Sequence, residues 1–162
     1  GSGLYAGIAA ALRDSGLPPS RLELEVTESL LLKTDALVES TLVAIKALGV
    51  RIALDDFGTG YSSLSYLRKY RFDKLKIDQS FISDIETNAD SRAIVDAVIR
   101  LGHDLGMSIA AEGVETEGQY DILRRLGCGE IQGYLIGRPV PADEMARFLG
   151  VTGKPRPVRR IA

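Results

Sequence analysis

The chain has 162 residues, of which 45% are apolar and 26% are charged, and its formal net charge is −2. This balance is typical of one globular domain, or of a large piece of one, and it excludes a disordered, collagen-like or coiled-coil chain. No apolar run approaches the roughly 20 residues that span a membrane, and no basic face suggests a nucleic-acid-binding domain. We therefore expect neither membrane contact nor a nucleic-acid polymer as partner.

Cysteine usage and the two ends of the chain suggest a compartment and domain limits. The single cysteine, Cys128, cannot form an internal disulfide, and no signal-peptide pattern opens the sequence. Both features favour a reducing cytoplasm. Residues 1–3 (Gly-Ser-Gly) look like a cloning remnant, and residues 151–162 form a basic tail that we expect to be disordered. The domain itself is predicted over residues 4–150.

Short β-like runs alternate with helical stretches along the chain. Alternation or short apolar runs predict five strands, at 22–27, 50–54, 75–77, 107–111 and 130–135. Apolar residues three and four apart, several times followed by glycine, predict six helices, at 4–14, 36–48, 61–70, 91–105, 117–126 and 141–149. This order indicates an α/β fold with a parallel sheet. It fits a small doubly wound domain or part of a (β/α)8 barrel, whose usual size is about 250 residues.

Polar residues cluster where the predicted strands end. They are Glu25, Glu28, Asp55, Asp56, Lys76, Asp78, Glu112, Glu115 and Gln132. In both parallel architectures ligands bind at the carboxyl ends of the strands, so we expect one shared pocket. Crowded carboxylates must take up protons or bind a cation, and oxygen ligands suit Mg²⁺, Mn²⁺ or Ca²⁺. Two adjacent cations would suit phosphodiester hydrolysis.

Simpler interpretations exist for several of these residues. One acidic residue at a strand end is often a helix N-cap or a solvated loop residue, although five such ends favour a common site. Lys76 lies between Leu75 and Ile77, and alternation leaves it facing either the pocket or the outside. His103 lies off the apolar stripe of its helix and is assigned no role. Cys128 has no histidine nearby in sequence and is not expected to be a nucleophile.

Five motifs resemble those of the EAL-domain cyclic-di-GMP phosphodiesterases. They are residues 25–29, 55–64, 76–78, 111–116 and 132–134. The resemblance implies a TIM-like barrel with one antiparallel strand. It also implies hydrolysis of cyclic di-GMP to linear pGpG with Mg²⁺ or Mn²⁺, in bacterial second-messenger signalling that regulates biofilms. A full-length protein would add a regulatory sensory domain, and this segment could be the cytoplasmic portion of a membrane-anchored signalling protein.

The resemblance also assigns roles to individual residues. The metal ligands that it implies are Glu25, Asp55, Asp56, Asp78 and Glu112. Glu112 matches the proposed general base as well, and Lys76 matches the lysine that holds the attacking water or the phosphate. The supporting positions are Glu28, which would hold the loop 56–63 through Thr59 or a neighbouring hydroxyl, together with Glu115 and Gln132.

The sequence also departs from the family pattern. It contains no Glu-Ala-Leu signature, and the asparagine ligand of the next strand is absent too. We therefore expect an incomplete barrel of about five parallel strands, the C-terminal two thirds of the domain. The function is either a phosphodiesterase, slow in this chain, or an impaired module that binds cyclic di-GMP or a protein partner. Open sheet edges and an uncovered apolar interior predict a homodimer.

Overall fold

The computed structural model describes residues 2–32, 36–58, 64–141 and 144–145 of the chain. Its framework is a five-stranded sheet in which every neighbouring pair is parallel. The strands follow one another in chain order and are β1 (Glu23–Thr27), β2 (Arg51–Phe57), β3 (Lys74–Ile77), β4 (Ser108–Ala111) and β5 (Glu130–Ile131). This order, with helices between successive strands, is that of consecutive βα units and confirms the parallel α/β prediction.

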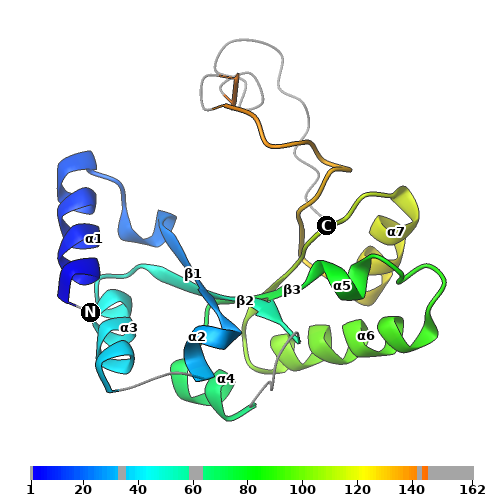
Figure 1. The fold of residues 1–162 in the computed structure, drawn as a ribbon, viewed down its shortest axis with the longest axis horizontal. Helices are drawn as coiled ribbons and strands as arrows, with labels where there is room; N and C mark the ends of the chain where they lie inside the picture. Colours follow the sequence, from blue (N-terminus) through cyan, green and yellow to red (C-terminus); the bar gives the residue numbers. More distant parts are fainter. Residues whose placement is uncertain (1, 33–35, 59–63, 142–143, 146–162) are drawn as a thin grey trace.

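The helices lie mainly on one side of the sheet. The longer ones are α1 (Ser2–Ser15), α3 (Ala36–Ala47), α4 (Leu64–Tyr70), α6 (Ala89–Asp104) and α7 (Glu117–Leu126). In Figure 1 these helices follow one another in an arc around the strands. Three shorter elements are η1 (Pro19–Arg21), α2 (Glu28–Leu32) and α5 (Gln79–Ile82). The arrangement is that of a partial barrel, with the helices on its outer side.

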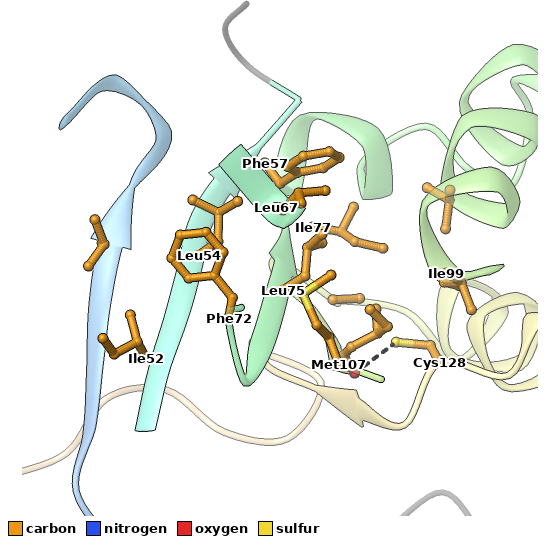
Figure 2. Close-up of a cluster of buried hydrophobic side chains, with 14 of the residues drawn as sticks. Ile52, Leu54, Phe57, Leu67, Phe72, Leu75, Ile77, Ile99, Met107 and Cys128 are labelled. Atoms are coloured by element: carbon orange, nitrogen blue, oxygen red, sulfur yellow. Dashed lines mark hydrogen bonds between the residues drawn. The ribbon is translucent and has the colours of Figure 1, made fainter. Parts of the chain in front are cut away.

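One face of the sheet is apolar and packs against these helices. Figure 2 shows Leu54 of β2 and Leu75 and Ile77 of β3 in one cluster with Ile99 of α6. All four side chains are at most 2% exposed. Successive strand residues point to opposite faces, so the residues between these leucines and isoleucines must face the inside of the arc. The outer core therefore decides which side chains are available to a site.

The inner face of the sheet is polar, contrary to the apolar interior that we expected. Glu23, Lys74 and Glu130 come from β1, β3 and β5, and their side chains form ion pairs with one another. Lys76, two residues beyond Lys74 and thus on the same face, pairs with further carboxylates. The apolar expectation was wrong because the alternation in the strands places nearly all of their leucine and isoleucine side chains outward.

Several element boundaries differ from the sequence prediction. The fifth strand ends at Ile131 instead of residue 135, and the helix predicted from residue 91 begins earlier, at Ala89, because Asn88 caps it by accepting from the backbone amides of Asp90 and Ser91. The helices α2 and α5 were not predicted. Most of the predicted helix 141–149 and the whole tail 151–162 lie outside the described residues, as do residues 61–63.

Two further findings concern the surroundings of this sheet. Within the described residues, β1 and β5 each pair with one neighbour only, so both edges of the sheet are open. In the same part of the chain, none of the helices combines the length and the apolar character needed to cross a bilayer.

Candidate active site

The carboxyl ends of the strands bring the expected polar residues to one edge of the sheet. Asp56, Asp78, Glu112, Glu115 and Gln132 line a common cavity of about 330 Å³, together with Tyr134. They come from β2, from the turn after β3, from the segment after β4 and from the segment after β5. Four stretches far apart in sequence thus form a single concave surface, as a parallel sheet of this kind requires.

Lys76 is at the centre of this arrangement. Its Nζ lies 2.8 Å from Oε1 of Glu25, 3.0 Å from Oδ1 of Asp55 and 2.6 Å from Oε1 of Glu112. The residue is only 5% exposed. Of the two orientations that alternation along the strand allowed, Lys76 therefore has the one that faces the pocket. Burial alone would lower the pKa of Lys76, but its hydrogen bonds to Glu112, Glu25 and Asp55 outweigh burial and raise that pKa. Lys76 is therefore a fixed positive charge and not a proton acceptor.

Asp55 and Asp56 both contribute to the site although adjacent strand residues normally point to opposite faces. The register between β2 and β3 shifts between Leu54 and Phe57, and Asp56 has a left-handed backbone with φ of 56°. Irregularities of this kind re-aim a side chain at the end of a strand, and aspartate tolerates the left-handed region better than most residues. One short bulge thus brings two neighbouring carboxylates to the same side of the sheet, next to Glu112.

Asp55, Asp56 and Glu112 form a group that fits a divalent cation. One carboxylate oxygen from each lies within 4.8 Å of the other two. Burial, then Asp55 and Asp78, raise the pKa of Asp56. The pKa of Glu112 is raised by burial and by Asp55 and Glu25, against the opposing effect of Lys76. Negative charge therefore exceeds what Lys76 neutralises, and an all-oxygen donor set of this type suits Mg²⁺ or Mn²⁺.

The other two expected ligands stand apart from that group. Glu25 is half exposed and contacts the site through Lys76. Asp78 lines the cavity, but its Oδ1 also accepts the backbone amide of Ser80 at 2.9 Å and caps α5. The N-cap interpretation and the site interpretation therefore both apply to Asp78.

Glu28 supports the loop that follows Asp55 and Asp56. It is only 4% exposed, and its Oε2 accepts the backbone amide of Gly58 at 3.3 Å. The contact joins the beginning of α2 to the end of β2, so it fits the predicted role of Glu28 in holding this loop. The group that Glu28 holds is a backbone amide. Thr59, the predicted partner, lies outside the described residues.

Removal of the Glu28 carboxylate should weaken metal binding while the protein stays folded. In Glu28→Ala the Gly58 amide loses its acceptor, and Asp55 and Asp56 lose the support of the loop that follows them. Supporting contacts of this kind are typically worth about 10–100-fold in metal affinity. Titration calorimetry with Mn²⁺ measures the change, and Glu28→Gln, which keeps an acceptor oxygen, should stay close to wild type. An unchanged affinity in Glu28→Ala would refute the loop role.

The sequence prediction missed the residues that shape the segment after Glu112. The Oε1 of Gln119 accepts the backbone amides of Glu115 at 2.7 Å and of Thr116 at 3.1 Å, while the Thr116 hydroxyl accepts the amide of Gln119. This is a capping box at the start of α7. Its signal, threonine followed three residues later by glutamine, is visible in the sequence. Gln119 thereby fixes the backbone between Glu112 and α7.

A glycine brings β5 close to that same segment. The Cβ of any side chain at Gly133 would lie 2.2 Å from the carbonyl oxygen of Val114 and 2.3 Å from its nitrogen. Val114 and Gln132 are joined there by a backbone hydrogen bond of 3.1 Å. The position of Gln132 beside the cavity therefore depends on the absence of a side chain at its neighbour.

Cys128 and His103 do not line the cavity. His103 is exposed on α6. Cys128 is fully buried, donates a weak hydrogen bond to the carbonyl oxygen of Ile109 (Figure 2), and burial raises the pKa of its thiol to about 11.

The thiol of Cys128 should accordingly resist alkylation in the folded protein. At pH 8 a pKa of about 11, against an ordinary value near 9, lowers the thiolate fraction about 100-fold, and burial slows access further. Native protein treated with iodoacetamide should stay unmodified over a period in which urea-unfolded protein reacts completely, as followed by mass spectrometry. Equal rates in the two states would contradict the buried position.

The chain is similar in sequence and structure to known proteins. Residues 2–139 match the family model of the EAL domain. The chain is 46% identical over 144 residues to MucR of Pseudomonas aeruginosa, a bifunctional diguanylate cyclase/cyclic di-GMP phosphodiesterase, covering 89% of this chain and 21% of MucR. The solved cyclic-di-GMP complex of the MucR phosphodiesterase superposes with a TM-score of 0.80 over 88% of this chain and 58% of that one.

Two further solved structures are similar. The EAL domain of Mycobacterium smegmatis DcpA is 39% identical, with a TM-score of 0.88, and the match covers 96% of this chain and 69% of that chain. The manganese/cyclic-di-GMP complex of Klebsiella pneumoniae BlrP1 is 36% identical, with a TM-score of 0.78, over 83% of this chain and 34% of that chain. The chain spans only 17–21% of the length of the curated relatives from Caulobacter, Sinorhizobium and Pseudomonas.

Proposed function

Since this chain belongs to the EAL-domain family, we propose that it forms the greater part of a domain that hydrolyses cyclic di-GMP to linear pGpG with Mg²⁺ or Mn²⁺. The observation that carries the proposal is the contact of Lys76 with three carboxylates beside the group Asp55, Asp56 and Glu112. Cyclic-di-GMP complexes of MucR and BlrP1, the latter with manganese, support the choice of ligand and metal.

The residues of the site have separate tasks in this reaction. Asp55, Asp56 and Glu112 would hold the cations, with Glu25 and Asp78 beside them, and bound cations supply a hydroxide at neutral pH and neutralise charge on the phosphate. Lys76 donates hydrogen bonds and orients the water or a phosphate oxygen for in-line attack. Glu112 accepts a proton from the water. The water oxygen bonds to phosphorus, one P–O bond of the ring breaks, and the leaving 3′ oxygen ends protonated.

The test is to identify products with each cation. The 162-residue chain, and the same chain extended at its N-terminus to the length of the relatives' EAL domain, are incubated with cyclic di-GMP and Mg²⁺, Mn²⁺, Ca²⁺ or EDTA. We expect the extended protein to yield pGpG with Mg²⁺ and Mn²⁺ and to be inhibited by Ca²⁺, whose looser coordination places the water poorly. Chromatography with mass detection identifies the product. Absence of pGpG with both Mg²⁺ and Mn²⁺ would reject the proposal.

A second function is a binding module without efficient turnover. It is favoured by the extent of the match, since the chain corresponds to 58% of the MucR chain and 69% of the DcpA chain. In that case the 162-residue chain binds cyclic di-GMP or a protein partner and hydrolyses the dinucleotide slowly or not at all. Calorimetric binding of cyclic di-GMP, without pGpG formation by the same sample, would distinguish it from the enzyme.

We also propose that the domain works in the cytoplasm, as part of a protein with a regulatory sensory domain, and that this chain associates with a second copy. The open edges at β1 and β5 present unpaired backbone groups that favour pairing with another chain. Multi-angle light scattering at micromolar concentration should therefore give the mass of a dimer or a higher oligomer. A stable monomer would contradict the association.

A further inference from the structure

A second charged layer lies beneath the candidate site on the same face of the sheet. Lys74 Nζ is 2.9 Å from Oε1 of Glu23 and 2.8 Å from Oε2 of Glu130, and Arg51 lies 3.3 Å from Glu23. Glu23 and Lys74 are two residues before Glu25 and Lys76 on their strands, and Glu130 is two residues before Gln132. We call Glu23, Arg51, Lys74 and Glu130 the floor layer.

Lys74 connects strands that are not neighbours in the sheet. It belongs to the central strand β3, whereas Glu23 and Glu130 belong to β1 and β5, the two edge strands. The three side chains therefore converge on the inner face of the sheet, and the two ion pairs cross over β2 and β4. Ala53 of β2 is aligned with Lys74, and Ala110 of β4 is aligned with Glu130. Both face inward by alternation, and their small side chains leave room for the crossing.

The two layers differ in charge balance. The floor layer has two positive and two negative side chains, so it is neutral. Around the candidate site, Lys76 faces Glu25, Asp55, Asp56 and Glu112, which leaves an excess of negative charge. The side chain of Lys74 is only 11% exposed, so its ion pairs are poorly screened by water. A cation is consequently attracted to the candidate site, and not to the floor layer, whose charges already neutralise one another.

We propose that Lys74 is a positioning residue: by holding Glu23 and Glu130 it draws both edge strands toward β3 and so sets the separation of Glu25 and Gln132, which follow two residues later on the same strands. The effect of Lys74 on catalysis rests on the proposed function, whereas its effect on the curvature of the sheet does not. Without Lys74 the sheet flattens, and Glu25 and Gln132 move away from Lys76 and Glu112.

The experiment compares Lys74→Met with Lys74→Arg and with Lys69→Met. Lys69 forms an exposed ion pair with Glu39, at 2.7 Å, and provides a matched loss of one lysine on the surface. Mn²⁺ affinity is measured by calorimetry, and hydrogen exchange is measured on β1 and β5, both well below the unfolding temperature. Glu130→Gln, which releases only one edge, is a milder variant in case Lys74→Met does not fold.

We expect Lys74→Met to bind Mn²⁺ about 10–100-fold more weakly and to exchange the backbone amides of Ile131 and Gln132 faster. Lys74→Arg should restore both properties, Lys69→Met should match wild type, and Glu130→Gln should affect β5 more than β1. A lower unfolding temperature with unchanged Mn²⁺ affinity and unchanged exchange would overturn the proposal. If the wild-type chain binds no Mn²⁺, the metal part of the proposed function fails, and the exchange data alone decide on Lys74.

Discussion

Replacement of Glu112 by alanine should lower the turnover of cyclic di-GMP by about 10²–10⁴-fold, the usual contribution of a general base, in the protein that shows the activity. Glu112 contacts Lys76 at 2.6 Å and belongs to the group with Asp55 and Asp56. Under the proposed mechanism its loss removes a proton acceptor and a metal ligand together, whereas the other residues that line the cavity remain. We therefore expect turnover to fall far more than the affinity for cyclic di-GMP.

Initial rates of pGpG formation and calorimetric binding of cyclic di-GMP test this expectation on the same preparations. Asp104→Ala is a suitable control, since Asp104 is an exposed acidic residue at the end of α6. Glu112→Gln separates the two tasks, because an amide oxygen can still approach a cation but cannot accept the proton. Wild-type turnover in Glu112→Ala would remove both assignments.

Substitution of Lys76 by methionine should destabilise the protein strongly in the absence of metal. Three carboxylates then lose their common positive partner. Removal of one partner from a buried pair costs about 3–5 kcal/mol, and the lower end applies here because Glu25 is half exposed. Added Mn²⁺ should restore more stability to Lys76→Met than to wild type, since the cation must now supply all of the neutralising charge.

Urea unfolding in EDTA and in Mn²⁺ measures this difference. Lys69→Met is the control, because its exposed partner Glu39 makes the pair worth less than about 1 kcal/mol. Turnover of Lys76→Met should be low even in saturating Mn²⁺, because the donor that orients the water or phosphate is lost. An unfolding free energy equal to that of wild type in EDTA would show that Lys76 is not the central charge of the site.

The sequence was sufficient for the parallel α/β fold and for the expectation that most of the selected polar residues lie close together, because the carboxyl ends of parallel strands meet at one edge of the sheet. Their roles in catalysis and metal binding stay predictions. It could not decide the orientation of Lys76. Alternation along β3 allowed both faces, and the answer depends on the outer core, where Leu75 and Ile77 pack against the helices. Three carboxylates from three other segments then fix the lysine head group, a long-range effect without a local signal.

Other differences between the predicted and the observed elements had local causes, which the spacing of apolar residues does not reveal. The helices α2 and α5 have five and four residues, too short for an apolar stripe to repeat. Strand β5 ends early because the chain turns at residues 134–136, where the backbone amide of Ile136 donates to the carbonyl oxygen of Gly133 at 3.1 Å. The pairing of Lys74 with Glu23 and Glu130 was missed since each residue, taken alone, looks like a solvated charge at the beginning of a strand. Only the order of the strands makes them partners.

The bulge at Asp56 places stability and function in opposition at one residue. A left-handed backbone costs a residue with a side chain roughly 1 kcal/mol, and the Asp56 carboxylate is further opposed by Asp55 and Asp78. Glycine at this position would relieve both costs and remove the carboxylate. A cation or another positive ligand bound beside Asp56 would offset both costs, so Asp56→Gly should be the more stable protein without a ligand and should lose that advantage when the ligand is present.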